Sequence, residues 1–404
     1  MSIRRRVTIV GASVAGCTAA ILYAKEGHSV FIIDRKSLND YKINCTHFIQ
    51  PLALPTIKKL DIQEDLEILG ATKSNLDIHT PRGCINHSEV FSHAINDVFG
   101  YNVQRKLLDP LLKKKMASFD NITFLERFHL KSVERDQYGK HKILIKGDST
   151  ELMVESDLLI AADGGDSKIA KITNNNGEVV KSGKFTFFAY FTGIPFKTSK
   201  HWVLNNATVY AGALTKQLTL VAFFFNKKEI NLWKNNHGID SKMLDFLGSL
   251  EGMPNLDKAK RASDIIWAQN IDNVYRKCYH NEIAFLGDAA MKTDPVSGTG
   301  CAFAFKSADL LFECTNNFLH NPGSDIKEGL MEYALKFNAF FRPHFEAISS
   351  TSKQEFLRPS DENFYSLVHK NKIIGKAYLK LIYRMISPKE FQNILISNIG
   401  LPIE

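Results

Sequence analysis

Three short apolar runs, each followed by a glycine-containing turn, are the clearest feature of the hydrophobic pattern. Residues 7–10 precede the turn GASVAG, residues 158–161 precede Asp163-Gly164, and residues 283–286 precede Gly287-Asp288. Such short runs bounded by glycine are typical of fully buried strands. A helical pattern follows each turn. The alternation predicts an α/β fold in which the strand ends gather at one edge of a sheet.

The first turn has the features of a dinucleotide-binding βαβ unit. GASVAG at residues 11–16 leads into a predicted helix at 15–26, and a second strand at 29–34 ends at Asp34. The helix N-terminus would present free amide groups to a pyrophosphate. Asp34 stands where a carboxylate accepts hydrogen bonds from adenosine ribose. Ser13 replaces the usual middle glycine, which tightens the approach of the phosphates without blocking it.

The stretch between the second and third motifs predicts a different kind of structure. Residues 184–196, 201–214 and 218–228 are rich in aromatic and β-branched residues and are expected to be strands of an antiparallel sheet. Alternate side chains belong to opposite faces, and the sequence does not say which face lines a substrate cavity. The candidate substrate contacts are Tyr190, His201, Tyr210 and Phe223.

The C-terminal part is predicted to be helical from residue 321 onward. In residues 371–386, four basic residues recur at four-residue steps on one side, opposite an apolar side. Pro388 is expected to end this helix, and a second amphipathic stretch covers 391–399. Three interpretations stay open: a helix packed on the core with a solvated basic face, peripheral membrane contact, or a lid over the substrate cavity. The basic residues are Lys372, Lys376, Lys380 and Arg384.

Length and charge narrow the class of protein. The 404 residues suffice for two domains that share an interface. The net charge of +8 is partly explained by anionic cofactors, and no nucleic-acid-binding module is recognisable. The six cysteines show neither CxxC pairs nor metal-ligand spacing, and no apolar run is long enough for a transmembrane span. We therefore expect reduced thiols, no metal site and a cytoplasmic location.

Taken together, the motifs resemble the FAD-dependent monooxygenases of the para-hydroxybenzoate hydroxylase type, also called aromatic-ring hydroxylases. The resemblance rests on GASVAG with Asp34, on Arg105 in RKLLDPLL, on Ala162-Asp163-Gly164 with Ser167, and on Gly287-Asp288 with the glycines that follow it. It spans about residues 5 to 318.

The resemblance implies a Rossmann-like FAD-binding domain, doubly wound and three-layered, with an inserted antiparallel substrate domain and a C-terminal helical region. The expected boundaries are 1–75, 100–178 and 268–320 for the FAD-binding domain, 76–99 and 179–267 for the substrate domain, and 321–404 for the helical region.

The resemblance also assigns roles to individual residues. Asp34 would bind the adenosine ribose, Asp163 would lie near the pyrophosphate and bear on NAD(P)H, and Asp288 would bind the ribityl chain. The turn after Asp288 would bring the N-terminus of a helix at 301–318 to the pyrimidine edge of the flavin. The full set of candidate cofactor-binding residues is Gly11, Ser13, Ala15, Gly16, Asp34, Arg35, Arg105, Asp163, Gly164, Asp288, Pro295, Gly298, Thr299 and Gly300.

No catalytic residue is assigned, because in this class the flavin performs the chemistry. The candidates near the flavin ring are His47, Pro295 and Gly298. His47 lies in a segment at 41–62 where the family places a mobile loop. Two interpretations of His47 stay open: contact with flavin, substrate or NAD(P)H, or a loop histidine paired with backbone.

The implied reaction is monooxygenation. NADPH or NADH would reduce non-covalently bound FAD, O₂ would add at the flavin C4a position, and the hydroperoxide would hydroxylate or epoxidise a bulky hydrophobic or aromatic small molecule. We expect a monomer or a homodimer. The alternatives are an FAD-dependent reductase of isoprenoid-type double bonds, a flavin-dependent halogenase, and a non-catalytic FAD-binding regulatory protein. The WxWxIP segment of halogenases is absent, because Trp202, Trp233 and Trp267 are not so spaced.

Overall fold

A parallel sheet with the predicted strands forms the base of the molecule. The computed structural model describes residues 5–91, 98–137, 139–234, 238–269, 271–321 and 323–398. The strand order is β21-β22-β12-β1-β2-β8, parallel except for the edge pair β21–β22. Strands β1, β2 and β12 coincide closely with the predicted apolar runs. The bounds are β1 (Arg6–Val10), β2 (Ser29–Asp34), β8 (Ile122–Glu126), β12 (Leu158–Ala161), β21 (Tyr279–His280) and β22 (Ile283–Phe285).

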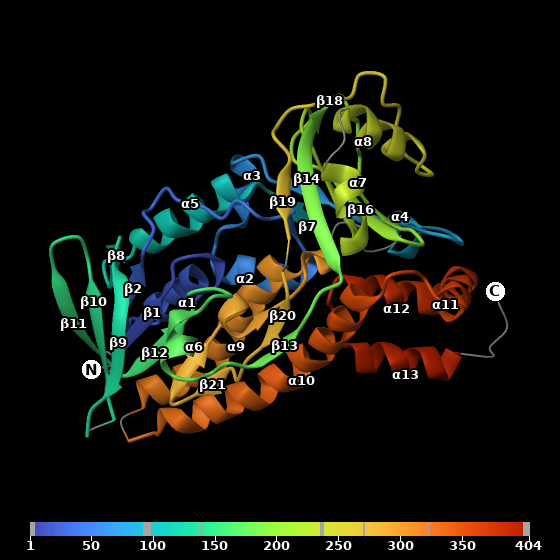
Figure 1. The fold of residues 1–404 in the computed structure, drawn as a ribbon. Coiled ribbons are helices and arrows are strands. Elements are labelled where there is room, and N and C mark those ends of the chain that lie inside the picture. The colour runs from blue at the N-terminus through green and yellow to red at the C-terminus, as the bar shows by residue number, and fades with distance from the viewer. Residues whose placement is uncertain are drawn as a thin grey trace.

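Helices and a small antiparallel meander complete this α/β unit (Figure 1). The helices α1 and α9 pack against each other beside the sheet. The meander β11-β10-β9 contributes Ile143, Ile145 and Val154 to the same core. The predicted FAD-binding fold class is therefore confirmed. The bounds are α1 (Val14–Lys25), α5 (Arg105–Ala117), α6 (Lys168–Ile172), α9 (Gly300–His320), α10 (Ile326–Lys353), β9 (His129–Arg135), β10 (His141–Lys146) and β11 (Glu151–Ser156).

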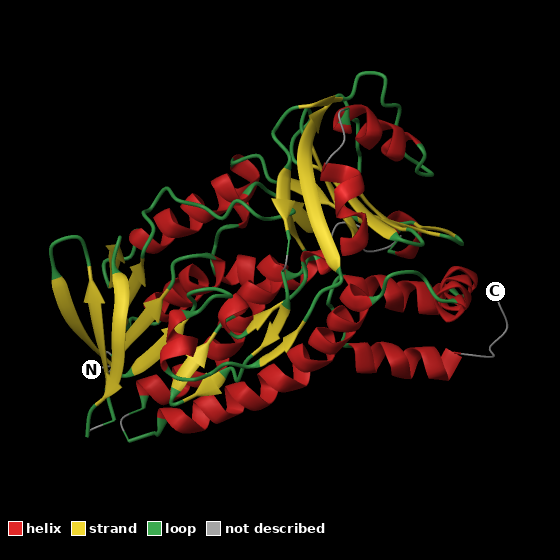
Figure 2. Cartoon of the chain, in the orientation of Figure 1, coloured by secondary structure: helices red, strands yellow, loops and turns green. Residues whose placement is uncertain are grey.

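A second, eight-stranded sheet rises above this unit, as the yellow arrows in the upper part of Figure 2 show. Its order is β18-β14-β17-β16-β15-β5-β6, and β19 also pairs with β14. The sheet is antiparallel, as predicted, except for the parallel pair β15–β5. The bounds are β5 (Leu76–Thr80), β6 (Gly83–Ile85), β14 (Lys184–Thr192), β15 (Ser199–Val203), β16 (Ala207–Ala213), β17 (Thr219–Asn226), β18 (Lys260–Arg261) and β19 (Ile266–Ala268).

The prediction of one strand over 201–214 was wrong. The segment forms the end of β15 and all of β16, joined by a turn at 204–206. Asn205 and Asn206 supply this turn, in keeping with the preference of asparagine for tight turns between paired strands.

The two faces of the large sheet bury different side chains. Phe187, Val221 and Phe223 pack on one face with Trp233 of α7 (Ile230–Lys234) and Met243 of α8 (Ile239–Gly248). The opposite face carries Phe188, Tyr190, Tyr210, Leu220 and Phe224 and packs with Val296 and the C-terminal helices. Among the described residues, Val296 of the glycine turn near 298 packs with this second face.

Three helices close the C-terminal end: α11 (Pro359–Lys370), α12 (Lys372–Ile382) and α13 (Pro388–Asn398). The predicted helix over 371–386 ends at Ile382, and Pro388 begins the next helix, where proline is well tolerated. Residues Ile374, Ala377 and Leu379 are buried, so α12 packs on the core. The basic face was predicted incorrectly at one position, because Arg384 is only 7% exposed.

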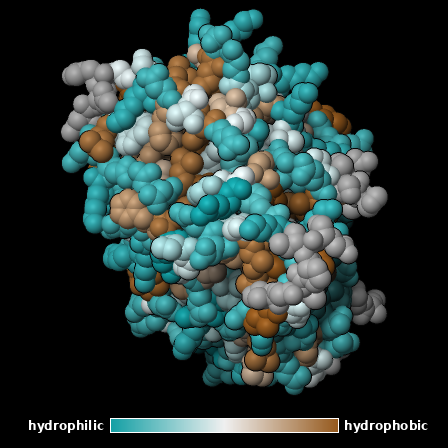
Figure 3. All heavy atoms as spheres, turned by 90° about the vertical axis from the view of Figure 1, so that its right-hand side faces the viewer, coloured by the Kyte–Doolittle hydropathy of each residue, from teal (hydrophilic) through white to brown (hydrophobic). Residues whose placement is uncertain are grey.

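Hydrophilic and hydrophobic side chains are interspersed on the molecular face that Figure 3 presents, which is the side of these C-terminal helices. Within the described ranges, no helix is both long and apolar enough to cross a membrane.

The remaining elements connect these parts. There are also two three-stranded sheets among the described residues, with the strand orders β13-β20-β23 and β3-β7-β4. The bounds are β3 (Phe48–Ile49), β4 (Thr72–Ser74), β7 (Gly100–Asn102), β13 (Glu178–Val180), β20 (Asn273–Tyr275), β23 (Met291–Lys292), α2 (Leu54–Lys59), α3 (Gln63–Ile68) and α4 (His87–Val90).

Candidate functional site

The first glycine turn leaves no space for side chains at its two ends. Gly11 has φ +108°, and a Cβ there would lie 2.2 Å from the carbonyl oxygen of Ala162. A Cβ on Gly16 would lie 1.8 Å from the carbonyl oxygen of Gly11. The turn therefore packs directly against the end of β12, and Ala15 is buried behind it. This close packing is the reason that a dinucleotide turn needs glycine at these positions.

Asp34 is held at the mouth of this turn by backbone groups. Its Oδ2 accepts a hydrogen bond from the Ala12 N–H at 2.5 Å, and its Oδ1 accepts one from the Lys36 N–H at 2.8 Å. The side chain remains partly exposed, while Arg35 next to it is exposed. The carboxylate is thus fixed beside the helix N-terminus, where it can still accept ribose hydroxyls.

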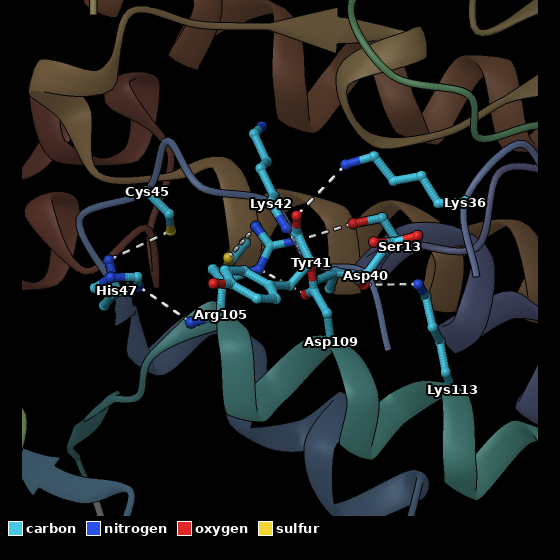
Figure 4. Close-up of polar contacts among 12 residues, drawn as sticks. Ser13, Lys36, Asp40, Tyr41, Lys42, Cys45, His47, Arg105, Asp109 and Lys113 are labelled. Atoms are coloured by element: carbon cyan, nitrogen blue, oxygen red, sulfur yellow. Dashed lines mark hydrogen bonds and ion pairs between the residues drawn. The ribbon is translucent and has the colours of Figure 1, made fainter. Parts of the chain in front are cut away.

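Arg105 is a buried cation at the centre of the site (Figure 4). Its guanidinium donates to both carboxylate oxygens of Asp109 at 2.7 and 2.9 Å and to Ser13 Oγ at 2.9 Å. A longer contact of 3.6 Å reaches the Sγ of Cys301. Sequence reasoning missed Asp109, although its position four residues after Arg105 on one helix is the usual spacing of such an ion pair. The hydrogen bond from Arg105 to Ser13 ties α5 to the first glycine turn.

His47 is bonded to backbone, as one of the two interpretations from the sequence had it, and also to a tyrosine of the large sheet. Its Nδ1 accepts the backbone N–H of Arg105 at 3.2 Å, and its Nε2 lies 2.6 Å from the Tyr190 hydroxyl. Because Nδ1 is an acceptor, the neutral ring carries its proton on Nε2 and donates it to Tyr190. His47 therefore links the start of α5 to the large sheet. Burial raises the pKa of Tyr190 to about 12, so the phenol stays protonated near neutral pH.

Two thiols lie beside this pair. Cys45 accepts the His47 backbone N–H at 3.3 Å, and its thiol is hydrogen-bonded to that of Cys301 at the start of α9. This hydrogen bond lowers the pKa of Cys45 and raises that of Cys301. Both cysteines are free thiols.

One carboxylate oxygen of Asp163 accepts backbone hydrogen bonds, and the other has no hydrogen-bond partner. Oδ2 accepts the backbone N–H groups of Lys168 and Ile169 at 2.7 and 3.2 Å, and so caps the start of α6. Oδ1 is buried without a hydrogen-bond partner, and burial raises the pKa of the carboxyl group. A buried polar atom without a partner is costly and points to a ligand that supplies one. Gly164, at φ +85°, has open space around its Cα.

Asp288 lies opposite a lysine of the loop that precedes His47. Lys42 Nζ is 3.0 Å from Asp288 Oδ2, and this charge raises the pKa of Lys42. The sequence gives no reason to pair Lys42 with Asp288, which is 246 residues away. The pair shows that the loop and the third glycine turn border the same space.

The turn from Pro295 to Gly300 presents backbone groups to that space. Gly298 has φ +60°, and no atom lies within 4 Å of a Cβ placed on Gly300. The Thr299 hydroxyl bonds those of Thr293 and Ser297 at 3.1 and 3.0 Å. The amide nitrogen of Gln50 donates to the Ser297 carbonyl at 3.1 Å, whereas its Oε1 is buried without a partner. Gln50 was not among the predicted site residues, and only the fold brings it to this turn.

The four substrate candidates do not share one surface. Tyr190 lies on the sheet face toward His47, and His201 lies on the same face by the alternation from Trp202. Tyr210 is on that face too, but its hydroxyl donates to Asn102 Oδ1 at 2.7 Å and lies 3.1 Å from Ser199 Oγ. Phe223 lies on the opposite face, against Trp233, because residue parity in β17 directs it there.

These features together fit FAD. The first turn with Asp34 offers an adenosine and pyrophosphate site. Asp163 Oδ1 at the second turn and Gln50 Oε1 beside the third turn are buried atoms without a hydrogen-bond partner. Gly164 and Gly300 leave open space at the second and third strand ends. Three strand ends arranged in this way define a FAD-binding protein of the Rossmann type.

The family comparison agrees. Residues 4–314 match the model of the FAD binding domain family, and the chain belongs to this family. It is 23% identical over 389 residues to digeranylgeranylglycerophospholipid reductase 2 of Methanococcoides burtonii, covering 93% of this chain and 90% of that protein. It is 21% identical to the FAD-dependent monooxygenase asqG of Emericella nidulans, covering 76% of this chain and 58% of that protein.

Solved structures show the same fold. The flavin-dependent halogenase CmlS superposes with a TM-score of 0.75 at 17% identity, over 98% of this chain and 78% of that one. PqsL, a probable FAD-dependent monooxygenase from Pseudomonas aeruginosa, superposes with a TM-score of 0.70 at 15% identity, over 98% of this chain and 100% of that one.

Proposed function

We propose that this flavoprotein is an FAD-dependent monooxygenase that uses NAD(P)H and O₂ to oxidise a hydrophobic or aromatic small molecule. The observation that carries the proposal is the aromatic sheet face that meets the third glycine turn. Phe188 and Phe224 on that face and Val296 of the turn belong to one apolar cluster, with the Tyr190–His47 pair at its polar edge. An apolar surround excludes water, which this chemistry requires. Monooxygenases among the relatives and structural neighbours support the proposal.

The chain's own residues divide the work of binding and positioning. The turn at Gly11 and Gly16, with Asp34, Asp163 and Asp288, would hold FAD, which supplies the redox and oxygen chemistry when bound. Peptide N–H groups at the start of α9 would stabilise negative charge at the pyrimidine edge of the ring.

Tyr190 would orient the substrate. Since His47 donates to its hydroxyl oxygen, the Tyr190 proton is free to be donated to an oxygen or nitrogen of a bound molecule. We also propose that the predicted division into a FAD-binding domain, a substrate domain and a C-terminal helical region separates these tasks along the chain.

A second candidate function is reduction of isoprenoid-type double bonds. It is favoured by one specific observation, the match to a reductase over 93% of this chain and 90% of that protein. A halogenase is less well supported, because Trp202 and Trp233 lie on the sheet face directed away from the third glycine turn.

Oxygen consumption separates these functions. The FAD-loaded protein is mixed with NADPH or NADH and a panel of polycyclic and isoprenoid compounds, with and without O₂ and with and without bromide. A monooxygenase consumes O₂ and NAD(P)H together when its substrate is present. Anaerobic, substrate-dependent flavin oxidation would instead establish the reductase, and a halide requirement the halogenase. Tyr190→Phe should raise KM for the substrate while leaving FAD content unchanged, with Tyr279→Phe, on the edge strand β21 of the base sheet, as the matched control.

A further inference from the structure

Arg384 is a buried cation without a counter-charge. Its side chain is only 7% exposed, and its Nε is buried without a hydrogen-bond partner. Among the residues that the structure describes, no carboxylate forms an ion pair with it. Burial lowers the pKa of the guanidinium to about 10, and the largest opposing influence is the Tyr378 phenol. An uncompensated buried charge is strongly unfavourable, so a folded protein keeps one when it binds something of opposite sign.

The backbone conformation at Arg384 is also unfavourable. The residue follows the end of α12 with φ +61°, and the Met385 N–H closes the turn by bonding the Lys380 carbonyl at 2.9 Å. Glycine is the favoured residue at this left-handed position after a helix, and a residue with a side chain is strained there. The chain thus carries arginine where both its backbone and its burial are unfavourable. Such an outlier supports a functional role for the side chain.

Two histidines on other elements come under the influence of the same charge. His344 of α10 is fully buried and neither ring nitrogen has a partner. His201 of β15 is partly accessible. Burial lowers the pKa of both rings, and the positive charge of Arg384 lowers it further. Near neutral pH both rings are therefore uncharged, so neither adds a second positive charge to that of Arg384.

The surroundings identify the chemistry of the rest of the ligand. Leu379 and Tyr383, which precede Arg384, belong to the apolar cluster on the Tyr190 face of the large sheet, together with the partly buried Val203 and Ile382. His344 in turn packs on Phe303, with ring centroids 5.7 Å apart, in the first turns of α9. The polar groups therefore lie within an apolar environment that reaches the third glycine turn.

We propose that Arg384 binds the carboxylate of a hydrophobic organic acid, whose apolar part lies along the Tyr190 face of the large sheet. This acid is the substrate if the proposed function is correct; the binding itself does not depend on that function. The strands at 184–228 contain no arginine that could bind a carboxylate. The structure supplies the cation from the C-terminal region instead.

The test is binding of matched probes to the oxidised, FAD-loaded full chain without NAD(P)H. 2-Naphthoate and 2-naphthamide have the same ring system and differ in charge. Isothermal titration should show 2-naphthoate binding about tenfold more tightly or better, as expected for a charge-assisted bidentate contact. Arg384→Gln should remove the preference, and Arg384→Lys should keep part of it. Lys380→Gln, which changes a basic residue on the helix that precedes Arg384, should leave the preference intact.

Thermal unfolding gives a second readout that needs no enzyme activity. Without ligand, Arg384→Met should melt at the wild-type temperature or above, because it removes an unpaired buried charge. 2-Naphthoate should raise the melting temperature of the wild-type protein and not that of Arg384→Met.

Equal binding of acid and amide by the wild-type protein, or no binding of either, would overturn the proposal, whatever the variants do. So would an acid preference that survives in Arg384→Gln. An acid preference in a protein that shows no oxygen-dependent turnover would leave the anion site established and refute only the monooxygenase.

Discussion

At the scale of single residues, the glycines of the turns differ in the space that surrounds them. Gly16 and Gly300 are both glycines at the N-terminal end of a helix, yet their surroundings differ. Protein backbone fills the space beside Gly16, whereas the space beside Gly300 is open. One glycine therefore serves internal packing, and the other leaves space for a ligand.

Alanine substitutions at these two glycines should separate stability from FAD binding. Gly16→Ala places a Cβ 1.8 Å from the Gly11 carbonyl oxygen and should lower the free energy of unfolding by about 1–3 kcal/mol as the turn is displaced. Gly300→Ala should unfold like the wild-type protein but bind FAD more weakly. Chemical denaturation and FAD titration measure the two effects. Normal FAD affinity in Gly300→Ala would place the flavin elsewhere.

Asp288→Ala should weaken FAD binding by about 1–3 kcal/mol, the range of a hydrogen bond to a charged group, while the chain stays folded. The lost pair with Lys42 should matter little for stability, since both side chains are solvent-accessible, at 29% and 49%. FAD fluorescence during titration measures the affinity. Asp61→Ala, which breaks an exposed pair with Lys25 outside the glycine turns, is the matched control. Unchanged affinity in Asp288→Ala would refute the proposed ribityl contact.

At the scale of elements, α12 shows how an amphipathic sequence is used. Ile374, Ala377 and Leu379 are buried in the cluster on the Tyr190 face and are not available to a bilayer, whereas Ile373 is exposed. Its lysines are not equivalent either, because Lys376 Nζ lies 5.8 Å from the ring centre of Phe91. The helix thus serves as a cover for the large sheet.

The double variant Lys376→Gln, Lys380→Gln should therefore be nearly silent toward membranes. Neither the wild-type protein nor the variant should sediment with anionic vesicles, because a basic face alone binds only weakly and the apolar face is occupied. Stability should fall by about 0.5–1 kcal/mol, the value of an exposed cation–π contact. Salt-sensitive sedimentation of the wild-type protein that the variant loses would show peripheral membrane binding instead.

At the scale of the whole molecule, buried neutral histidines make stability depend on pH. His87 and His344 are fully buried, and burial lowers their pKa values to about 4 and about 3. In the unfolded chain a histidine titrates near 6.5, so between these values the unfolded state binds more protons. These histidines therefore do not reduce the free energy of unfolding above pH 6.5, and they reduce it progressively as the pH falls from 6.5 toward 4.

Denaturant unfolding at pH 7 and pH 5 measures this effect. Each of the two histidines should lower the free energy of unfolding by about 2 kcal/mol between these values. His344→Phe should reduce the pH dependence, because phenylalanine does not titrate and suits the neighbouring Phe303 and Phe340 rings. A variant with the wild-type dependence on pH would show that His344 is protonated in the folded protein.

The sequence by itself determined the α/β base, the three glycine turns and the aromatic sheet. Each of these depends on local pattern: apolar runs of strand length, glycine at positions without space for a Cβ, and strict alternation of side chains. For the same reason the ends of β1, β2 and β12 agree closely with the prediction.

Only the tertiary structure decided which residues meet across the site. The choice of the Tyr190 face over the Phe223 face depends on what packs on each side of the sheet, and periodicity is the same for both. Gln50 reaches Ser297 across 247 residues, and His47 reaches Tyr190 across 143 residues. Such contacts arise from the burial of whole faces against one another, which no local pattern encodes.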